Sequence, residues 1–254
     1  MRPTMAAKEP REKYILDLLA KDGSLSVSAL SRDLGVSEVT IRANLRDLET
    51  RGLLTRTHGG AQASSIQSVL ERQRVRQAEK ERIGAAAAAL VKDGDAMMVE
   101  AGTTTATVIR NLAGRAGLQV VTNSTLVFAA ARINTSMRVT LTGGNFHHES
   151  ESLVGFHALR TIHDFNVRIA FIGTDGFTVD RGITTQFAEG ADVIRAMSER
   201  SEETWLVADS SKYGRAGFVN VLPLDRLTGI VTDADMSEES LTVLRDSGLQ
   251  VVVA

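Results

Sequence analysis

The chain has 254 residues, of which 43% are hydrophobic and 24% charged, proportions typical of a globular protein with one or two domains. It contains no cysteine, which excludes disulfides, thiolate metal sites and cysteine nucleophiles. Residues 1–82 carry 15 Lys+Arg against 11 Asp+Glu, whereas residues 83–254 carry 14 against 20. A mildly basic amino-terminal part suits contact with DNA at one end. No apolar run is long enough to cross a bilayer and no secretory signal is evident, so we expect a cytoplasmic protein without a membrane partner.

The first sixty residues show the periodicity and punctuation of three short helices followed by a strand. The helices are predicted over Arg11–Lys21, from a cap at Ser26 to a stop at Gly35, and from a cap at Ser37 to a stop at Gly52. Residues 53–60 are predicted to form a strand that runs into a glycine-rich wing. Two helices joined by a tight glycine turn are the core of a helix-turn-helix, which inserts its second helix into the major groove of DNA.

The third predicted helix has one apolar face and one polar face. Its buried stripe is predicted to be Ile41, Leu45 and Leu48. On the other face, Arg42 suits guanine, and Val39 and Thr40 suit a thymine methyl. The full set of predicted DNA contacts, which adds flanking residues and residues placed for phosphates or the minor groove, is Ser37, Val39, Thr40, Arg42, Ala43, Arg46, Arg56 and His58. On this pattern alone, a three-helix packing module without nucleic acid stays open.

From residue 83 onward, strand and helix patterns alternate, and several strand candidates are nearly continuous apolar runs. Strands are predicted at Ala96–Val99, Leu118–Thr122, Arg138–Leu141, Ile169–Ile172, Thr204–Ala208, Gly229–Thr232 and Gln250–Val253, and helices at Thr105–Leu112, Thr125–Ile133, Ala188–Arg200 and Glu238–Asp246. The alternation predicts an open, mainly parallel α/β sheet. With a candidate hinge at Gln62–Gln67, we expect a winged domain at 1–62, a linker and connecting helix at 63–82, and a ligand-sensing domain at 83–254.

Polar segments that contain glycine follow several of the predicted strands. Residues 100–105 place one glycine and three threonines between a strand and a helix, where backbone N–H groups and hydroxyls can bind one phosphate. Lys212 can pair with a phosphate, and Asp175 can accept hydrogen bonds from sugar hydroxyls. Because the carboxyl ends of parallel strands meet at one edge of a sheet, we expect one ligand site. The predicted contacts are Glu100, Gly102, Thr103, Thr104, Asn123, Ser124, Gly144, Asp175 and Lys212.

A specific motif runs through the amino-terminal helices and the wing. It consists of VSEVTIR at 36–42, Leu45, Leu48-Glu49, Gly52-Leu53 and RTHGGA at 56–61. This motif closely resembles the N-terminal signature of the DeoR family of bacterial transcription regulators. The resemblance implies a winged helix-turn-helix and, usually, repression of a sugar-catabolic operon. The family often has Arg-Asp where this chain has Ala43-Asn44, so we expect the chain's own base preference to arise there.

Motifs in the rest of the chain resemble the sensor domain of the same family, in the same order. They are Gly102-Thr103-Thr104, Thr122-Asn123-Ser124, Gly143-Gly144, Gly182–Thr185 with Glu189, and DSSKYG at 209–214. The resemblance implies a sheet like that of ribose-5-phosphate isomerase and glucosamine-6-phosphate deaminase, with a phosphorylated sugar as effector. Glu100 departs from the usual Asp and could reshape the sugar end of the site. The prediction is a repressor, active as a homodimer or homotetramer, that a phosphorylated sugar releases from double-stranded operator DNA.

The same kinship leaves an enzymatic alternative, a sugar-phosphate isomerase or deaminase with an appended DNA-binding domain. Isomerisation needs a base that removes a carbon-bound proton, and Asp175, Glu189 and Glu100 are candidates. No Asp-His-Glu relay is evident, and His147-His148 lack a third metal ligand. We therefore expect no catalytic residue, no metal and no cofactor. The sequence leaves open which sugar is the effector, although the resemblance is nearest to amino-sugar and galactitol members. It also leaves open the operator sequence and the choice between repression and activation.

Overall fold

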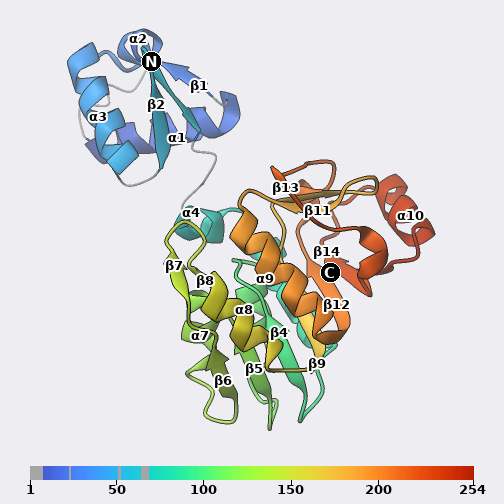
Figure 1. Cartoon of the computed structure of the whole chain (residues 1–254). Coiled ribbons are helices and arrows are strands. Elements are labelled where there is room, and N and C mark those ends of the chain that lie inside the picture. The colour runs from blue at the N-terminus through green and yellow to red at the C-terminus, as the bar shows by residue number, and fades with distance from the viewer. Residues whose placement is uncertain (1–7, 23, 51–52, 64–68) are drawn as a thin grey trace. The chain divides into compact units, whose positions relative to one another are not determined.

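The computed structural model describes residues 8–22, 24–50, 53–63 and 69–254, which divide into two compact units, Met1–Arg72 and Gln73–Ala254 (Figure 1). The linker predicted at 63–82 spans this division. Most of the hinge predicted at Gln62–Gln67 lies outside the described residues. No helix within the described ranges is long and apolar enough to cross a membrane.

The first unit is a winged helix-turn-helix, as predicted. Its elements are α1 (Lys8–Asp22), β1 (Ser24–Ser26), α2 (Val27–Leu34), α3 (Glu38–Thr50), β2 (Leu54–Thr57) and β3 (Gly60–Ala63), and α4 (Val69–Arg74) crosses the division. The three strands pair antiparallel in the order β1-β3-β2. Apolar side chains from all three helices and from the strands form one core, and Ile41, Leu45 and Leu48 on α3 are buried in it as expected.

Two glycines set the turns of this unit. Gly35 ends α2 with φ +66°, a left-handed conformation that is strained for other residues. At Gly60 a Cβ would lie 2.0 Å from the Leu25 carbonyl oxygen, so only glycine lets β3 approach β1 this closely. The predicted cap at Ser26 is wrong in its chemistry. Ser26 stands at the cap position of α2, but its hydroxyl bonds that of Ser28 at 2.8 Å and caps no backbone N–H.

The second unit is built on a sheet of seven strands that are all parallel. The strands are β4 (Ala96–Val99), β5 (Gln119–Thr122), β6 (Arg138–Leu141), β9 (Val167–Ile172), β12 (Ser201–Val207), β14 (Gly229–Thr232) and β15 (Gln250–Val253). Their order across the sheet is β15-β14-β12-β9-β4-β5-β6. The predicted parallel α/β sheet is therefore confirmed.

Helices cover both faces of this sheet (Figure 1). On one face lie α5 (Gln77–Ala88), α6 (Thr105–Arg110) and α7 (Thr125–Ala131), and on the other α8 (Phe156–His163), α9 (Ala188–Glu199) and α10 (Glu238–Asp246). The alternation of side chains along β4 shows this directly, since Met97 packs with the first set and Met98 with the second. Both methionines are fully buried.

Several short elements lie outside the predicted ones. They are a hairpin of β7 (Asn145–His147) and β8 (Ser152–Val154), helix α8, and a small antiparallel sheet of β10 (Gly176–Thr178), β11 (Gly182–Thr185) and β13 (Val219–Leu222). These strands span three or four residues each, too few for a period to stand out in a sequence. Short 3-10 turns, η1 (Ser210–Lys212) and η2 (Leu224–Arg226), flank β13.

The strand order has a switch point between β4 and β9. From β4 the chain adds β5 and β6 toward one edge of the sheet, and from β9 it adds β12, β14 and β15 toward the other. At such a point the connections leave the strands in opposite directions, which opens a crevice at the carboxyl ends where ligands bind in open α/β sheets. The topology thus selects the residues after β4 and β9 as a candidate site.

Helices α5 and α6 approach each other closely at Gly84, which makes one packing contact testable. A Cβ on Gly84 would lie 2.1 Å from the Thr107 hydroxyl oxygen. We expect Gly84→Ala to destabilise the second unit by about 1–2 kcal/mol, because overpacking exceeds the roughly 1 kcal/mol by which a helix favours alanine over glycine. Urea unfolding followed by fluorescence of Trp205, the chain's single tryptophan, measures this. A stabilised Gly84→Ala would contradict the close approach, and Ala85→Ser on the exposed side of α5 is the control.

Candidate DNA interface and effector site

Helix α3 presents the predicted base-reading residues at its amino-terminal end. The hydroxyl of Ser37 caps the helix by accepting a hydrogen bond from the backbone N–H of Thr40 at 3.1 Å. Val39 is 77% exposed, an unusual position for a valine, and Arg42 is also exposed. Ala43 and Arg46 are exposed as well. This face can therefore contact a groove without rearrangement of the core.

The wing and α3 line one shallow cavity of about 290 Å³. Arg42 of α3, Arg56 of β2 and His58 of the β2–β3 turn all line it, which brings three predicted DNA contacts together. All three side chains are exposed. The arrangement can therefore offer two guanidinium groups and an imidazole to a phosphate backbone on one side of the unit.

Two glutamates, neither of them predicted as part of the site, hold these arginines. Glu49 accepts the Arg56 Nε–H at 2.6 Å and also the backbone N–H of Arg56 at 3.0 Å. The hydrogen bond from the Arg56 side chain lowers the pKa of the Glu49 carboxyl below its ordinary value. Glu38 pairs with Arg42 at 3.3 Å, one helical turn away. Both pairs orient the arginines, and a phosphate could replace either glutamate as their partner.

Asn44 does not lie on the exposed face of α3 that carries Arg42. Its side chain is only 4% exposed, and its Oδ1 accepts the Arg11 Nε–H at 2.8 Å. Arg11 itself is buried on α1. The expectation that the Ala43-Asn44 pair sets base preference is therefore wrong for Asn44, which ties α3 to α1. Helical geometry accounts for this, because Asn44 lies three residues after Ile41 and shares its buried face.

In the second unit, segments from three neighbouring strands meet at the switch point. Glu100 follows β4, is largely buried, and accepts the Gly173 N–H, after β9, at 3.2 Å. The backbone N–H of Ala101 donates to Asn123 Oδ1, after β5, at 3.0 Å. The structure thus brings together Glu100 and Asn123, which were predicted from separate motifs, because Asn123 bonds the residue directly after Glu100.

Asn123 and Ser124 are committed to internal hydrogen bonds. Asn123 is 1% exposed, and its Nδ2 donates to the carbonyl of Leu153 in the β7–β8 hairpin at 3.3 Å. Ser124 is fully buried and caps α7 by accepting the Val127 N–H at 3.2 Å. Both side chains therefore hold backbone segments in place where β4 and β5 end.

Asp175 and Lys212 lie on adjoining segments beside the small antiparallel sheet. Asp175 Oδ2 accepts the hydroxyl of Thr185 at 2.9 Å. The Gly214 N–H donates to the Phe177 carbonyl at 3.0 Å, which holds the stretch after Lys212 against β10. Lys212 is half-buried, and within the described part of the chain its ammonium has no hydrogen-bond or ion-pair partner. It is therefore the cation in this group that can accept a new anionic partner.

The remaining predicted contacts are placed differently. Thr103 lines a separate cavity of about 300 Å³, between the start of α5 and α6, together with Lys80 and Arg110. The carbonyl of Thr104 accepts a hydrogen bond inside α6, and that of Gly102 accepts one from its first turn. Gly144 has φ +117°, and a Cβ there would lie 2.5 Å from the Val154 carbonyl oxygen. Gly144 is thus required by the hairpin, whatever it does with a ligand.

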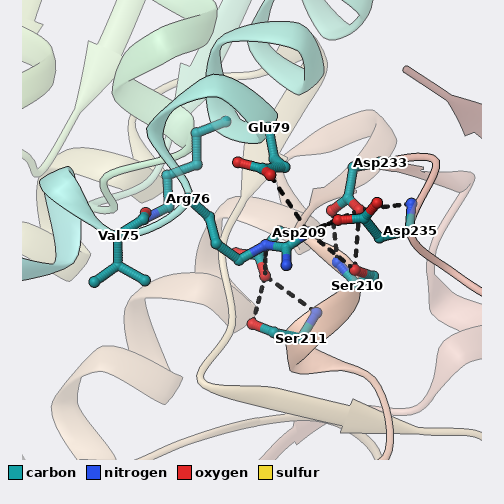
Figure 2. Close-up of polar contacts among 9 residues, drawn as sticks. Val75, Arg76, Glu79, Asp209, Ser210, Ser211, Asp233 and Asp235 are labelled. Atoms are coloured by element: carbon teal, nitrogen blue, oxygen red, sulfur yellow. Dashed lines mark hydrogen bonds and ion pairs between the residues drawn. The ribbon is translucent and has the colours of Figure 1, made fainter. Parts of the chain in front are cut away.

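Arg76 gathers carboxylates that follow two strands of the sheet (Figure 2). Its guanidinium lies 3.3 Å from Asp209, 3.0 Å from Asp233 and 2.6 Å from Asp235. Asp209 follows β12 and Asp233 follows β14, so Arg76 joins the α4–α5 turn to the carboxyl edge of the sheet. Burial opposes ionisation of Asp233, but hydrogen bonds from Ser210 and the nearby positive charge lower its pKa below the ordinary value.

Neither Arg76 nor Asp233 was among the predicted site residues. Asp233 could have been found by the rule that selected Asp209's neighbourhood, because it too follows an apolar strand directly. Arg76 carries no such signal, since a lone arginine in a charged helical stretch is usually solvated. Only its long-range contacts, 133 or more residues away in sequence, set it apart.

His147 takes part in local contacts. Its ring stacks on Phe187 with centroids 4.3 Å apart, and its Nδ1 lies 2.8 Å from the Ser150 hydroxyl. Within the described residues there is no group of three or more His, Asp or Glu side chains arranged to hold a metal ion. The stack instead packs the β7–β8 hairpin against the start of α9.

Sequence comparison places both units in one family. Residues 11–67 match the DeoR-like helix-turn-helix domain, and residues 75–234 match the DeoR C terminal sensor domain. The chain belongs to the DeoR family. It is accordingly a DNA-binding transcriptional regulator, and the predicted family resemblance is confirmed.

Relatives match over nearly the whole chain. A putative aga operon transcriptional repressor from Escherichia coli O157:H7 is 30% identical over 96% of this chain and 93% of its own length. The HTH-type transcriptional regulator GlpR of Haloferax volcanii is 34% identical over 95% and 96%. A ribose 5-phosphate isomerase A from Methanocaldococcus jannaschii aligns at a TM-score of 0.40 with 18% identity, covering 53% of each chain. A TM-score of that size carries no conclusion about activity.

Proposed function

We propose that this DeoR-family regulator represses a carbohydrate-utilisation operon and that a phosphorylated sugar releases it from its operator. The observation that supports the proposal most is the site at the switch point of the parallel sheet, where the segments after β4, β5 and β9 are in direct contact. Lys212, on the segment after β12, is the proposed partner of the phosphate. Another relative, from Escherichia coli K12 and 29% identical to this chain, is named a glycerol-3-phosphate regulon repressor, which points to the same ligand class.

The proposed mechanism is a population shift. A ligand that binds the conformation with low DNA affinity a hundredfold more tightly couples the two sites by about 2.7 kcal/mol. Reciprocity then requires operator DNA to weaken ligand binding by the same factor. The winged units would act in pairs, as a homodimer or homotetramer, on half-sites about one DNA turn apart. Such a regulator works beside the chromosome, so we place it in the cytoplasm.

The proposal is tested with selected DNA and a defined set of ligands. The operator is obtained by binding selection from random duplexes. Glycerol 3-phosphate, ribose 5-phosphate, fructose 6-phosphate and glucosamine 6-phosphate are then screened by thermal shift, each beside its unphosphorylated counterpart. We expect one phosphorylated compound to raise the melting temperature and to weaken operator binding. Ligand affinity that does not respond to operator would contradict the mechanism for that compound, and sedimentation of the complex gives the stoichiometry.

We further propose that the chain is not an enzyme. Two of the three carboxylates considered as bases are engaged, because Glu100 accepts a backbone N–H and Asp175 accepts the Thr185 hydroxyl and a backbone N–H. An isomerase base needs instead to reach a carbon-bound proton of the substrate. Incubation with the same sugar phosphates tests this, since turnover at ordinary enzyme rates, on the order of 1 per second or faster, would favour the enzymatic alternative.

Arg42 gives a specific prediction for the DNA interface. We expect Arg42→Ala to weaken binding to the selected operator by roughly 1–3 kcal/mol and to relax preference at one base pair, because a bidentate contact to guanine is lost. The measurement is a set of operator variants, each changed at a single base pair. Arg46→Ala is the matched control from the same helix. It should weaken all sequences alike and flatten the salt dependence, and equal specificity profiles for Arg42→Ala and the unmodified protein would remove Arg42 from base readout.

A further inference from the structure

Arg76 adopts a backbone conformation that its residue type rarely takes. It has φ +53° and ψ +41°, in the left-handed region, and it forms the α4–α5 turn together with Val75. Of the described residues other than glycine, only Arg76 and Glu151 have positive φ. Such a conformation persists where surrounding contacts hold it, and the contacts at Arg76 are carboxylates (Figure 2).

The same carboxylates hold the turn that carries Lys212. Asp209 accepts the backbone N–H of Ser211 at 3.1 Å, and Asp233 accepts the backbone N–H of Ser210 at 2.8 Å and its hydroxyl at 2.9 Å. Ser210 and Ser211 are the first two residues of η1, and Lys212 is the third. The Arg76 guanidinium also donates directly to the Ser210 hydroxyl at 3.3 Å (Figure 2). Asp209 and Asp233 therefore connect two segments that are far apart in the sequence.

Burial makes this connection stiff. Asp209 is 3% exposed and Asp233 is fully buried, so water cannot readily replace a lost partner. If the Lys212 turn moves, these carboxylates either follow it or lose hydrogen bonds, and in both cases the ion pairs of Arg76 change. A second contact holds the Arg76 turn, since the Lys80 ammonium donates to the Val75 carbonyl at 2.7 Å.

Arg76 lies next to the helix that joins the two units, so the carboxylates that link it to the Lys212 turn can affect that helix. Val75 and Arg76 directly follow α4, which begins in the first unit and ends in the second. We infer that Arg76 is the positioning residue through which the Lys212 turn controls the α4–α5 segment, and so transmits ligand binding to the DNA-binding unit. This inference rests on the proposed function, because it names the regulatory route from that same site. Arg76 itself does not contact the ligand in this scheme.

The first experiment needs neither ligand nor DNA. The chain has no cysteine, so Val75→Cys, at a half-exposed position, can be spin-labelled alone. We expect the label to be immobilised, and to gain mobility when Asp233→Asn removes a charge far away in the sequence without altering the labelled turn. Arg168→Met is the matched control, because it breaks ion pairs at the opposite end of the sheet. Arg168 pairs with Asp95, just before β4, and with Glu203, near the start of β12. Equal mobility with and without Asp233→Asn would overturn the inference.

The second experiment measures coupling. The ratio of operator Kd values with and without the strongest compound of the sugar-phosphate screen is determined for the unmodified chain, Arg76→Met and Arg76→Gly. Glycine adopts the left-handed turn without strain, so Arg76→Gly keeps the fold if Arg76→Met does not. We expect the ratio to fall to within about threefold of one in both variants, while compound affinity of the free protein changes less than about threefold.

The outcomes separate this inference from the proposed function. A retained ratio in Arg76→Gly would overturn the inference while leaving the phosphosugar mechanism intact. Lost compound binding in that variant would make Arg76 part of the binding site, which also overturns the inference. If no compound releases the unmodified protein, the proposed mechanism fails for those ligands, and the spin-label measurement alone decides whether the carboxylates hold the Arg76 turn.

Discussion

Lys212→Ala should leave operator binding unchanged and abolish release by the phosphorylated sugar. The Lys212 ammonium has no hydrogen-bond or ion-pair partner within the described part of the chain, so its removal breaks no internal contact of that kind. A charge-assisted hydrogen bond contributes about 1.5–3 kcal/mol, so ligand Kd should rise by roughly 10- to 100-fold. Titration calorimetry with the strongest compound of the screen gives this change, and operator binding at fixed ligand concentration gives the loss of release.

Lys92→Ala provides the control for this prediction. Lys92 is exposed and lies just before β4, at the opposite end of the strands from Lys212. Lys92→Ala removes one positive charge from the second unit, as Lys212→Ala does, so any general effect of net charge on DNA or ligand affinity appears in both variants. Loss of operator binding in Lys212→Ala alone would show a structural role. An unchanged ligand affinity would show that the phosphate binds elsewhere, for example near Lys80 and Arg110 in the cavity lined by Thr103.

The features predicted well from the sequence are those fixed by local chemistry. The Ser37 cap and the Gly35 stop depend on residues within one helical turn, and both are present. The central strands of the large sheet are buried on both faces, so they appear as compact apolar runs, such as Ala96–Val99. Parallel pairing then follows from the helices between them.

Features that depend on distant partners could not be predicted in the same way. The carboxylates around Arg76 are separated from it by most of the second unit, and nothing near position 76 indicates them. Likewise, β11 pairs with β13 across the η1 turn, through strands of four residues. Glycine and threonine motifs at the strand ends pointed to a ligand site, yet part of their role is structural. Gly144 relieves a clash in the hairpin and Ser124 caps α7.

Asn44→Ala should destabilise the winged unit by about 3 kcal/mol, since a buried hydrogen bond to a charged group contributes about 1.5–3 kcal/mol and the truncation also leaves unfilled space. The Arg11 guanidinium is buried on α1 and uses Asn44 as an acceptor. In a unit of some seventy residues this loss is a large share of the total stability, which is often only a few kcal/mol at that size. Hydrogen exchange of the α3 amides, measured by mass spectrometry on the full chain, should show faster opening.

The neighbouring Ala43→Arg separates stability from base preference. Ala43 is exposed on the face of α3 that carries Arg42, so an arginine there can reach the groove without disturbing the core. We expect Ala43→Arg to change the preferred base at one or more operator positions while the α3 amides exchange as in the unmodified protein, and Asn44→Ala to do the reverse. If Asn44→Ala altered base preference while hydrogen exchange of the α3 amides stayed unchanged, the role assigned to the Asn44–Arg11 hydrogen bond in holding α3 would be wrong. One position of the pair would then determine which DNA is bound, and the other whether α3 is held in place to bind it.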